Sequence, residues 1–476
     1  MTIILDSRRD FTLDAAKQVA WGNATVTLGQ RAQQAMSAAR ARFLRLLDDT
    51  DAVIYGVTSG YGHHAKLRFT PAERAAHAKR PPFGPAVSWG DPLPERATRA
   101  IVFARLSNFV EGHAAITPAV ANAVAAMLSG SPLPPVPTRG QGGAGEIVAL
   151  SHLFLPLAQS RELAEKDSLC LVNGSPAATG LVTDAALAGS ARLDMATEAF
   201  AYAAEAFNTP LDHFSAHFED FWNNPHDSWA LRRLRDLIAG GHGGDRRPYQ
   251  APVSFRILPR MLGQAHLAAA LTADVAAQAL PAVTDNPVLL PPTPADPDGI
   301  VISTGGYHNA QAPLALDALT AAYANLAIIA ERMSAKLLDP AISLLPDDLG
   351  QEPGQPFLGC LPMAATGYEE EARSLATATL LPGSESGGFG QNDVASPVFL
   401  AWSKQERAGL LAEQSLAVLA TIAARAYRST ARPVPAPLLA IDDLVHAHLP
   451  DGDETLMLGP ATATLAAAFR DRIHRA

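Results

Sequence analysis

Two long apolar stretches constrain the fold of this 476-residue chain more than any other feature. Residues 312–339 and residues 403–429 are each long enough for roughly seven helical turns at a rise of about 1.5 Å per residue. Both stretches are apolar on more than one face, unlike a surface helix with a single buried stripe. Helices buried this widely belong in the middle of a bundle or of an oligomer.

The rest of the chain predicts further helices, little strand and several polar loops. Residues 29–49 lack internal Gly and Pro and predict a helix. Residues 94–112 begin with a proline and end near a glycine, which predicts a second helix. Residues 282–290 and 299–308 flank a Pro/Asp-rich segment and predict a small hairpin. We therefore expect a mostly α fold.

Composition excludes several classes of protein. With 48% hydrophobic residues the chain can bury a large core, and a net charge of −10 argues against a nucleic-acid partner. No apolar run of about 18 residues lacks a charge, and the first residues are too charged for a signal peptide, so we expect a cytoplasmic protein without a membrane partner. Cys170 and Cys360 are too few for a disulfide framework, lack a metal-binding pattern and read as small buried side chains.

A glycine cluster precedes one of the predicted helices. The segment "QGGAGEIVAL" at residues 141–150 places Gly143, Ala144 and Gly145 before an apolar run. Only glycine adopts positive φ without steric cost, so such a cluster predicts an unusual backbone conformation. Polar residues also interrupt apolar surroundings in six further segments, "YGVTSGYG" (55–62), "LVNGS" (171–175), "QAPVSFR" (250–256), "TDNP" (284–287), "STGGYHN" (303–309) and "GFGQNDVAS" (388–396).

Taken in order, these segments resemble the aromatic amino acid lyase family, which comprises the histidine, phenylalanine and tyrosine ammonia-lyases. The family's Y-G-x-x-T-G-F-G corresponds to "YGVTSGYG", L-x-N-G-T to "LVNGS", and Q-D-x-Y-S-L-R to "QAPVSFR". Its S-D-N-P, G-N-F-H-G and S-H-A correspond to "TDNP", "GGYHN" and "AHA", and its Q-E-D or N-Q-D to "QND" at residues 391–393.

The resemblance implies both a fold and residue roles. The fold is an L-aspartase-like long helical bundle, with a loop-rich N-terminal region at residues 1–200 that carries the tyrosine and triad loops, and a central bundle with C-terminal helices at 201–476. The implied catalytic residues are the base Tyr55, the essential Asn173 and the carboxylate-binding Arg256. The implied substrate-binding positions are Gly62, His77, Gln250, Tyr307, Gln391 and Asn392. The family also implies a homotetramer whose sites are shared between subunits and take a small amino-acid-like substrate.

One feature of the family is missing. In these lyases an Ala-Ser-Gly triad cyclises and loses water to form the electrophilic methylidene-imidazolone group. This chain has Gly143-Ala144-Gly145 at that place, and an alanine methyl group has no hydroxyl to eliminate. We therefore expect no cofactor. Other positions differ too, with Val253, Gly306 and Asn392 where the family has Tyr, Asn and Glu or Gln, which favours natural divergence over a single engineered change.

The remaining residues still suit an elimination. Tyr55 can remove a proton if cations or donated hydrogen bonds lower its pKa well below about 10, and Arg256 can bind a carboxylate through two parallel hydrogen bonds. A quaternary ammonium leaves as a neutral amine and needs no electrophile. Ergothionase, a relative that lacks the prosthetic group and releases trimethylamine from a histidine betaine, is similar in this respect. The rings of Tyr61, Tyr307 and Phe389 are candidates to face such a cation.

Three hypotheses follow: a lyase without the prosthetic group, an ammonia-lyase with a disabled triad, and a non-catalytic binding homologue. We favour the first, because a binder has no need for a base. Glu369, Glu370 and Glu371 read as a solvated helix face paired with Arg373, or alternatively as negative potential near the site. The pair His63 and His64 lacks a third ligand, so no metal site is predicted.

Overall fold

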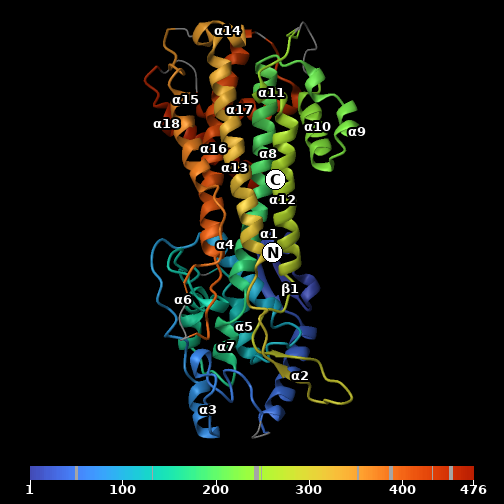
Figure 1. Ribbon diagram of the computed structural model, residues 1–476, viewed down its shortest axis with the longest axis vertical. Helices are drawn as coiled ribbons and strands as arrows, with labels where there is room; N and C mark the ends of the chain where they lie inside the picture. The colour runs from blue at the N-terminus through green and yellow to red at the C-terminus, as the bar shows by residue number, and fades with distance from the viewer. Residues whose placement is uncertain are drawn as a thin grey trace. The chain divides into compact units, whose positions relative to one another are not determined.

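The computed structural model in Figure 1 describes residues 1–48, 52–130, 132–240, 246–247, 249–350, 353–384, 390–430, 432–449 and 454–475. The chain is mostly helical and divides into two compact units. The first unit is Met1–Leu187, Thr272–Leu316 and Thr379–Ser403, and the second is Ala188–Leu271, Asp317–Ala378 and Lys404–Ala476. Each unit therefore combines three separate segments, whereas the sequence-based division at residue 200 stays a prediction about domain organisation.

The first unit combines short helices, two small sheets and many loops. Helix α4 is buried along almost its whole length, including its polar residues, and packs against α1 and α5. Strands β1 and β2 pair in parallel, and β3 and β4 form the predicted antiparallel hairpin. The elements of this unit are β1 (Thr2–Leu5), α1 (Leu13–Ala20), β2 (Thr25–Leu28), α2 (Gln30–Leu46), α3 (Pro71–Ala78), α4 (Glu95–Ser107), α5 (Pro118–Ala126), α6 (Ile147–Gln159), α7 (Asp167–Val172), β3 (Val288–Leu289) and β4 (Val301–Ile302), with 3-10 turns η1 (Arg8–Asp10), η2 (Gly62–His64) and η3 (Ala144–Glu146).

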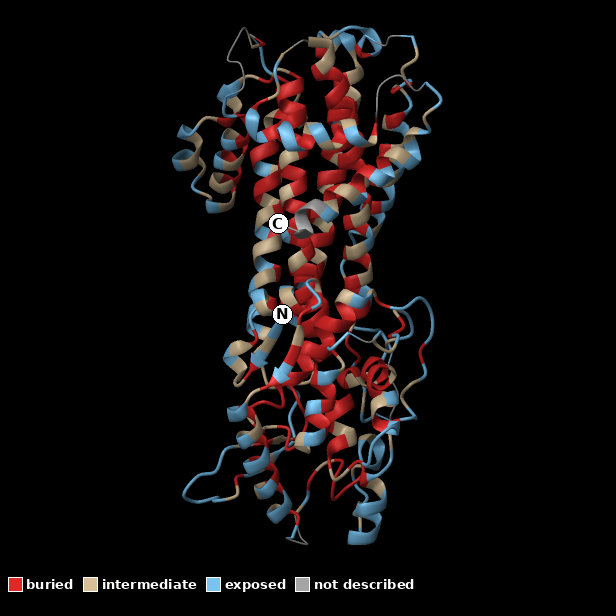
Figure 2. Ribbon diagram, turned by 180° about the vertical axis from the view of Figure 1, so that it is seen from behind, coloured by how far each residue is buried: buried red, intermediate tan, exposed pale blue. Residues whose placement is uncertain are grey.

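Four of the five divisions between the units lie within long helices, which are α8 (Pro176–Ala206), α12 (Leu258–Ala279), α13 (Gln311–Leu338) and α16 (Val398–Thr430). Inside the second unit, buried polar contacts join them. Arg192 of α8 donates to Glu413 of α16 over 2.8 Å, and its guanidinium lies 5.2 Å from the centre of the Tyr323 ring of α13. Gln264 of α12 accepts a hydrogen bond from Asn325 of α13 over 3.1 Å. These four helices form the buried centre of that unit (Figure 2).

Shorter helices complete the second unit. Helices α9 and α10 pack against each other, and α18 packs against both α15 and α17. The elements are α9 (His217–Trp222), α10 (Pro225–Ile238), α11 (Val253–Arg256), α14 (Pro340–Ser343), α15 (Leu361–Leu375), α17 (Leu439–His448) and α18 (Leu458–Arg475), with 3-10 turns η4 (Leu211–Phe214), η5 (Asp347–Leu349) and η6 (Ala436–Leu438).

The structure confirms the mostly α fold and the predicted helices, which appear as α2, α4, α13 and α16. Helix α4 ends at Ser107, before the glycine at which we expected its end. Cys360 is exposed, contrary to its predicted burial, because it lies at the N-cap of α15, outside the core. By length and composition α13 is apolar enough to cross a membrane, but 67% of its most apolar window is buried inside the protein, as in a core helix.

Candidate active site

A cavity of about 950 Å³ lies within the first unit. Its walls come from segments far apart in the sequence, chiefly the loops before α3 and α6, the start of the segment after α7, and the loop after β4. Ten of the twelve predicted site positions line it: Tyr55, Gly62, His77, Gly143, Ala144, Gly145, Asn173, Tyr307, Gln391 and Asn392. The fold therefore brings together residues that the sequence places more than 300 positions apart.

The other two predicted residues, Gln250 and Arg256, belong to the second unit and are not part of this lining. Gln250 is exposed. Arg256 ends α11 and donates through Nε to the carbonyl of Ala251 over 2.9 Å. Val253, at the position of the family's tyrosine, is 55% exposed.

Tyr55 is the one phenol of the predicted mechanism, and its hydroxyl oxygen accepts a hydrogen bond from the backbone N–H of Gly62 over 2.9 Å. Burial raises the pKa of Tyr55, the Gly62 N–H lowers it, and the neighbouring Tyr307 and Tyr61 raise it again. The net shift is upward, whereas a base requires a downward shift. Within this chain alone, the sequence-based requirement for a lowered pKa is therefore not met, because burial outweighs the single donated hydrogen bond.

Asn173 faces the triad loop across a narrow gap. Gly145 has φ of 61°, and a Cβ atom there would lie 3.2 Å from Asn173 Oδ1 and 3.5 Å from the Tyr307 ring. Positive φ and close approach both favour glycine at this position. Asn173 is 7% exposed, and its Oδ1 has no hydrogen-bond partner within the described part of the chain. A buried acceptor of this kind is available to a donor on a bound ligand.

The triad loop does not fit the family's prosthetic group. Ala144 begins the η3 turn and lines the cavity, so its position matches that of the cyclising serine. Its methyl side chain has no oxygen to lose as water. The backbone turn is retained, but the atom from which the methylidene forms is missing. No step of the chemistry below passes through that group.

Glu146 follows the triad and joins it to the next long helix. Its two carboxylate oxygens accept hydrogen bonds from the backbone N–H groups of Ala177 and Ala178, over 2.6 and 2.8 Å, at the first turn of α8. Burial raises the pKa of Glu146 to about 8, although the two N–H donors and Arg105 oppose that shift. The contact holds the triad loop against the start of α8, immediately after the loop that carries Asn173.

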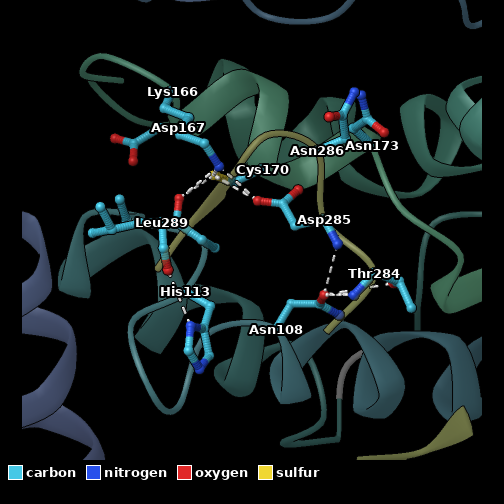
Figure 3. A network of polar contacts seen from close by, with 12 residues as sticks. Asn108, His113, Lys166, Asp167, Cys170, Asn173, Thr284, Asp285, Asn286 and Leu289 are labelled. Carbon is cyan, nitrogen blue, oxygen red and sulfur yellow. Dashed lines mark hydrogen bonds and ion pairs between the residues drawn. The ribbon is translucent and has the colours of Figure 1, made fainter. Parts of the chain in front are cut away.

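A buried network of charges lies beneath the two asparagine-bearing loops (Figure 3). Lys166 Nζ contacts Asp285 Oδ2 at 2.6 Å and donates to the Ala114 carbonyl over 2.7 Å. Arg105 donates to Asp285 Oδ1 over 3.2 Å and also to the backbone carbonyl of Asn173. The side chains of Lys166, Asp285 and Arg105 are fully buried. Asp285 thus links the "TDNP" loop to the loop of Asn173 through Arg105.

Cys170 is a member of this network, near Lys166 at 3.3 Å. Burial raises the pKa of the Cys170 thiol to about 12 despite the nearby lysine, so it stays protonated at neutral pH. Burial lowers the pKa of Lys166, but Asp285 and Cys170 more than offset this, and the net shift is upward. Lys166 is therefore a cation neutralised by Asp285. The thiol has no catalytic role in this arrangement and reads as a buried structural side chain.

The "TDNP" loop is held from two further sides. Asn108 of the segment after α4 accepts hydrogen bonds from the backbone N–H groups of Thr284 and Asp285, over 2.7 and 3.0 Å. Asn286 Oδ1 accepts from Ser303 Oγ and from the Thr304 N–H, over 3.0 and 2.8 Å. Asn286 and Asn173 both line the cavity. The hairpin is thereby fixed at the wall of the cavity.

Several residues singled out in the sequence have no place in the lining. Glu369, Glu370 and Glu371 lie on α15 in the second unit. Glu370 and Glu371 are exposed, as a solvated face requires, but Glu371 pairs with Arg407 at 2.6 Å instead of Arg373, and Glu369 is buried.

His63 and His64 are also outside the lining. They are exposed on η2 with their ring centres 3.7 Å apart. Among the described residues, no group of three or more His, Cys, Asp or Glu side chains is placed to hold a metal ion. Phe389 lies outside the described residues.

Sequence reasoning missed two charged residues of the lining, Arg80 and Lys166, and one amide, Asn286. Asn286 is part of the "TDNP" motif, so the motif could have identified it as a site residue. Lys166 and Arg80 stand in ordinary charged segments, where a lysine or arginine is normally solvated. Only the fold shows that Lys166 is buried and that Arg80 borders the cavity.

Solved structures share this fold over nearly the whole chain. Ergothionase from Treponema denticola, in complex with desmethyl-ergothioneine sulfonic acid, matches with a TM-score of 0.88 and 19% identity over 99% of each chain. Tyrosine aminomutase from Streptomyces globisporus matches with a TM-score of 0.88 and 21% identity, covering 100% of this chain and 98% of the other. Histidine ammonia-lyase from Trypanosoma cruzi has a TM-score of 0.85 and 20% identity, with coverage of 100% and 95%.

Sequence comparison agrees. Histidine ammonia-lyase from Anaeromyxobacter sp. (strain K) is 29% identical over 390 residues, which is 74% of this chain and 75% of that protein. The relatives and the match to a family model identify an enzyme of the carbon–nitrogen lyase class. The model of the aromatic amino acid lyase family matches residues 11–162 and 158–447. The chain belongs to this family.

Proposed function

We propose that this enzyme eliminates an amine from the betaine of an aromatic or imidazole amino acid, with Tyr55 as the base and without a methylidene-imidazolone group. The observation that carries the proposal is Ala144, which stands at the cyclising position of a cavity that nine of the other predicted residues also line. A primary amine leaves poorly without protonation or covalent activation. A quaternary ammonium needs neither, because it departs as a neutral amine.

The cavity wall can attract a cation through aromatic rings, without an acidic side chain. Tyr55, Tyr61 and Tyr307 all line it, and its described lining contains no Asp or Glu. Aromatic faces attract a quaternary ammonium through the quadrupole of the ring, by about 0.5–2 kcal/mol per contact. The same cation favours the phenolate form of Tyr55 once it is bound. The substrate thereby supplies the positive charge that the chain itself does not place beside this phenol.

The reaction then balances without a further reactant. The Tyr55 phenolate takes the β-proton, and the electrons of the C–H bond form the new carbon–carbon double bond. The C–N bond breaks with its electron pair on nitrogen, which leaves as the tertiary amine. Arg256 of a neighbouring copy holds the carboxylate through a bidentate pair, and Asn173 Oδ1 accepts from a ring N–H of the substrate.

The role given to Arg256 requires an oligomer, and we infer a homotetramer with shared sites. Large apolar side chains exposed on the single chain support this inference, since such surfaces mark contacts between proteins. Leu314 of α13 is 68% exposed, Leu400 of α16 is 60% exposed, and Leu380 is 77% exposed. A cytoplasmic location is part of the same proposal.

The direct test supplies purified protein with histidine, phenylalanine and tyrosine and with the trimethylammonium betaine of each. We expect trimethylamine from at least one betaine and no ammonia from the free amino acids. The intact mass should equal that of the unmodified chain. A mass lower by two water molecules would show that a prosthetic group has formed, and ammonia release from an amino acid would contradict the proposed substrate class.

The pH dependence offers a second test. In the free enzyme the pKa of Tyr55 is raised, so kcat/KM should rise with pH through the whole neutral and mildly alkaline range. A bound cation favours the phenolate, so the inflection of kcat should lie at lower pH than the inflection of kcat/KM. Both are measured as amine release across a pH series. Coincident inflections would show that the substrate does not assist ionisation of the base.

One alternative is favoured by the relatives. Histidine ammonia-lyases are the curated relatives reported above, and an ammonia-lyase with a disabled triad is consistent with that similarity. Under this alternative, Ala144→Ser restores the near-ultraviolet absorbance of the prosthetic group together with ammonia release from histidine, phenylalanine or tyrosine. Under our proposal the substitution leaves the substrate preference for betaines unchanged.

A further inference from the structure

The cavity has two chemically different ends around Tyr55. At one end Asn173, Gly145 and Tyr307 lie within a few ångströms of one another. At the other end the Tyr61 ring contacts the His77 ring, with their centres 5.4 Å apart. The Tyr55 phenol is close enough to both Tyr307 and Tyr61 for each of them to raise its pKa. All three tyrosines line the same cavity, so a substrate reacting at Tyr55 has both groups within the same space.

The His77 end carries an unused cation. Arg80 lines the cavity three residues after His77, and its backbone N–H donates to the His77 carbonyl over 3.1 Å. Burial lowers the pKa of His77, a hydrogen bond to the Gly56 backbone opposes this, and the nearby positive charge of Arg80 lowers the pKa further, so the net shift is downward and the imidazole is neutral at neutral pH. A neutral imidazole offers one donor and one acceptor, whereas Arg80 offers a fixed positive fork.

No described residue of the chain neutralises the positive charge of the Arg80 guanidinium. The Arg80 side chain makes no hydrogen bond and no ion pair there, and the described lining contains no carboxylate. The adjacent Lys79 differs, since it is not part of the lining and pairs with Glu162 at 3.7 Å. The other cation of the lining, Lys166, is already bound to Asp285. Arg80 is thus the lining cation left for a ligand.

We propose that Arg80, with His77 beside it, binds an acidic substituent on the side chain of the substrate, such as a sulfonate, a thiolate or a carboxylate. This inference uses the cavity of the proposed function and adds that the substrate carries a second negative group besides its α-carboxylate. A planar guanidinium binds such a group through two charge-assisted hydrogen bonds. Arg80 therefore sets specificity and takes no part in bond breaking.

The test uses ligands that lack an amine, so turnover does not affect it. The probes are 3-(4-sulfophenyl)propanoate and 3-(4-sulfamoylphenyl)propanoate, which have nearly the same shape but differ by one charge. Isothermal titration at fixed ionic strength should show that the wild-type protein binds the sulfonate about tenfold more tightly, as a charge-assisted hydrogen bond provides. Arg80→Gln should make the two affinities equal, and Arg80→Lys should retain part of the difference.

Lys79→Gln is the matched control, because it removes an equal charge one residue away and should preserve the tenfold preference. Equal weakening of both probes by Arg80→Gln would assign Arg80 to the shared carboxylate and overturn the inference. Absence of any preference in the wild-type protein, or absence of binding by both probes, would overturn it too. Because neither probe has a leaving group, these outcomes are independent of whether betaines are substrates.

Discussion

Replacing Tyr55 with phenylalanine should lower the rate of amine release by about 10²- to 10⁴-fold, the usual contribution of a positioned general base. The substitution removes the phenol oxygen that accepts from the Gly62 N–H and keeps the ring that forms part of the cavity wall. Binding of substrate should therefore change little, and the loss should appear in kcat. Trimethylamine release under saturating and subsaturating substrate separates the two parameters.

The cavity contains its own control for this experiment. Tyr61 lines the same space and contacts His77, but its hydroxyl is not the proposed base. Tyr61→Phe should leave kcat within a few-fold of the wild-type value. If Tyr55→Phe retained more than a tenth of the activity, or if both substitutions reduced kcat equally, the proton would be taken by another group and the proposed mechanism would be wrong.

Replacing Asp285 with asparagine should reduce the free energy of unfolding by about 3–5 kcal/mol, because it leaves two buried cations without their shared counter-charge. The carboxylate lies 2.6 Å from Lys166 Nζ and 3.2 Å from the Arg105 guanidinium, and all three side chains are fully buried. Asparagine keeps the size of the side chain, so the loss reports charge and not a cavity. Urea denaturation at constant protein concentration, followed by far-ultraviolet circular dichroism, measures it.

An exposed pair in the same unit provides the comparison. Arg8 and Glu111 lie 2.8 Å apart, but their side chains are 38% and 31% exposed. Because solvent screens such a pair, Glu111→Gln should cost only about 0–1 kcal/mol. Similar losses for the two substitutions would show that the buried network does not stabilise this unit. A surviving Asp285→Asn enzyme should also lose activity, since Arg105 connects that carboxylate to the backbone of Asn173.

Two of the four long helices were predictable because their own residues specify them. The apolar stretches at 312–339 and 403–429 appear as α13 and α16, and the hairpin around the Pro/Asp-rich segment appears as β3 and β4. The sequence reading did not identify α8 or α12. Strands β1 and β2 were also missed, since they are short and are stabilised by pairing between segments about 20 residues apart.

The motifs of the candidate site were predictable from the sequence, but the burial, ion pairing and pKa shifts of their residues were not. The sequence identifies Tyr55, but its upward-shifted pKa arises from burial and from two other tyrosines. It identifies "TDNP", but the partner that fixes Asp285 is a lysine from an unremarked segment. It gives no reason to separate Arg80 from Lys79, because both are cations in one charged segment. Solvation, pairing and orientation depend on neighbours that are remote in sequence.

The sequence alone determined the helical class, the order of the lyase motifs and the lack of a hydroxyl at Ala144, because periodicity and residue chemistry are properties of local segments. The tertiary structure decided which motifs share one cavity, which cation is neutralised and which remains free for a ligand. That information requires the long-range packing of the first unit, since burial and electrostatic pairing act between side chains that only the fold brings within a few ångströms.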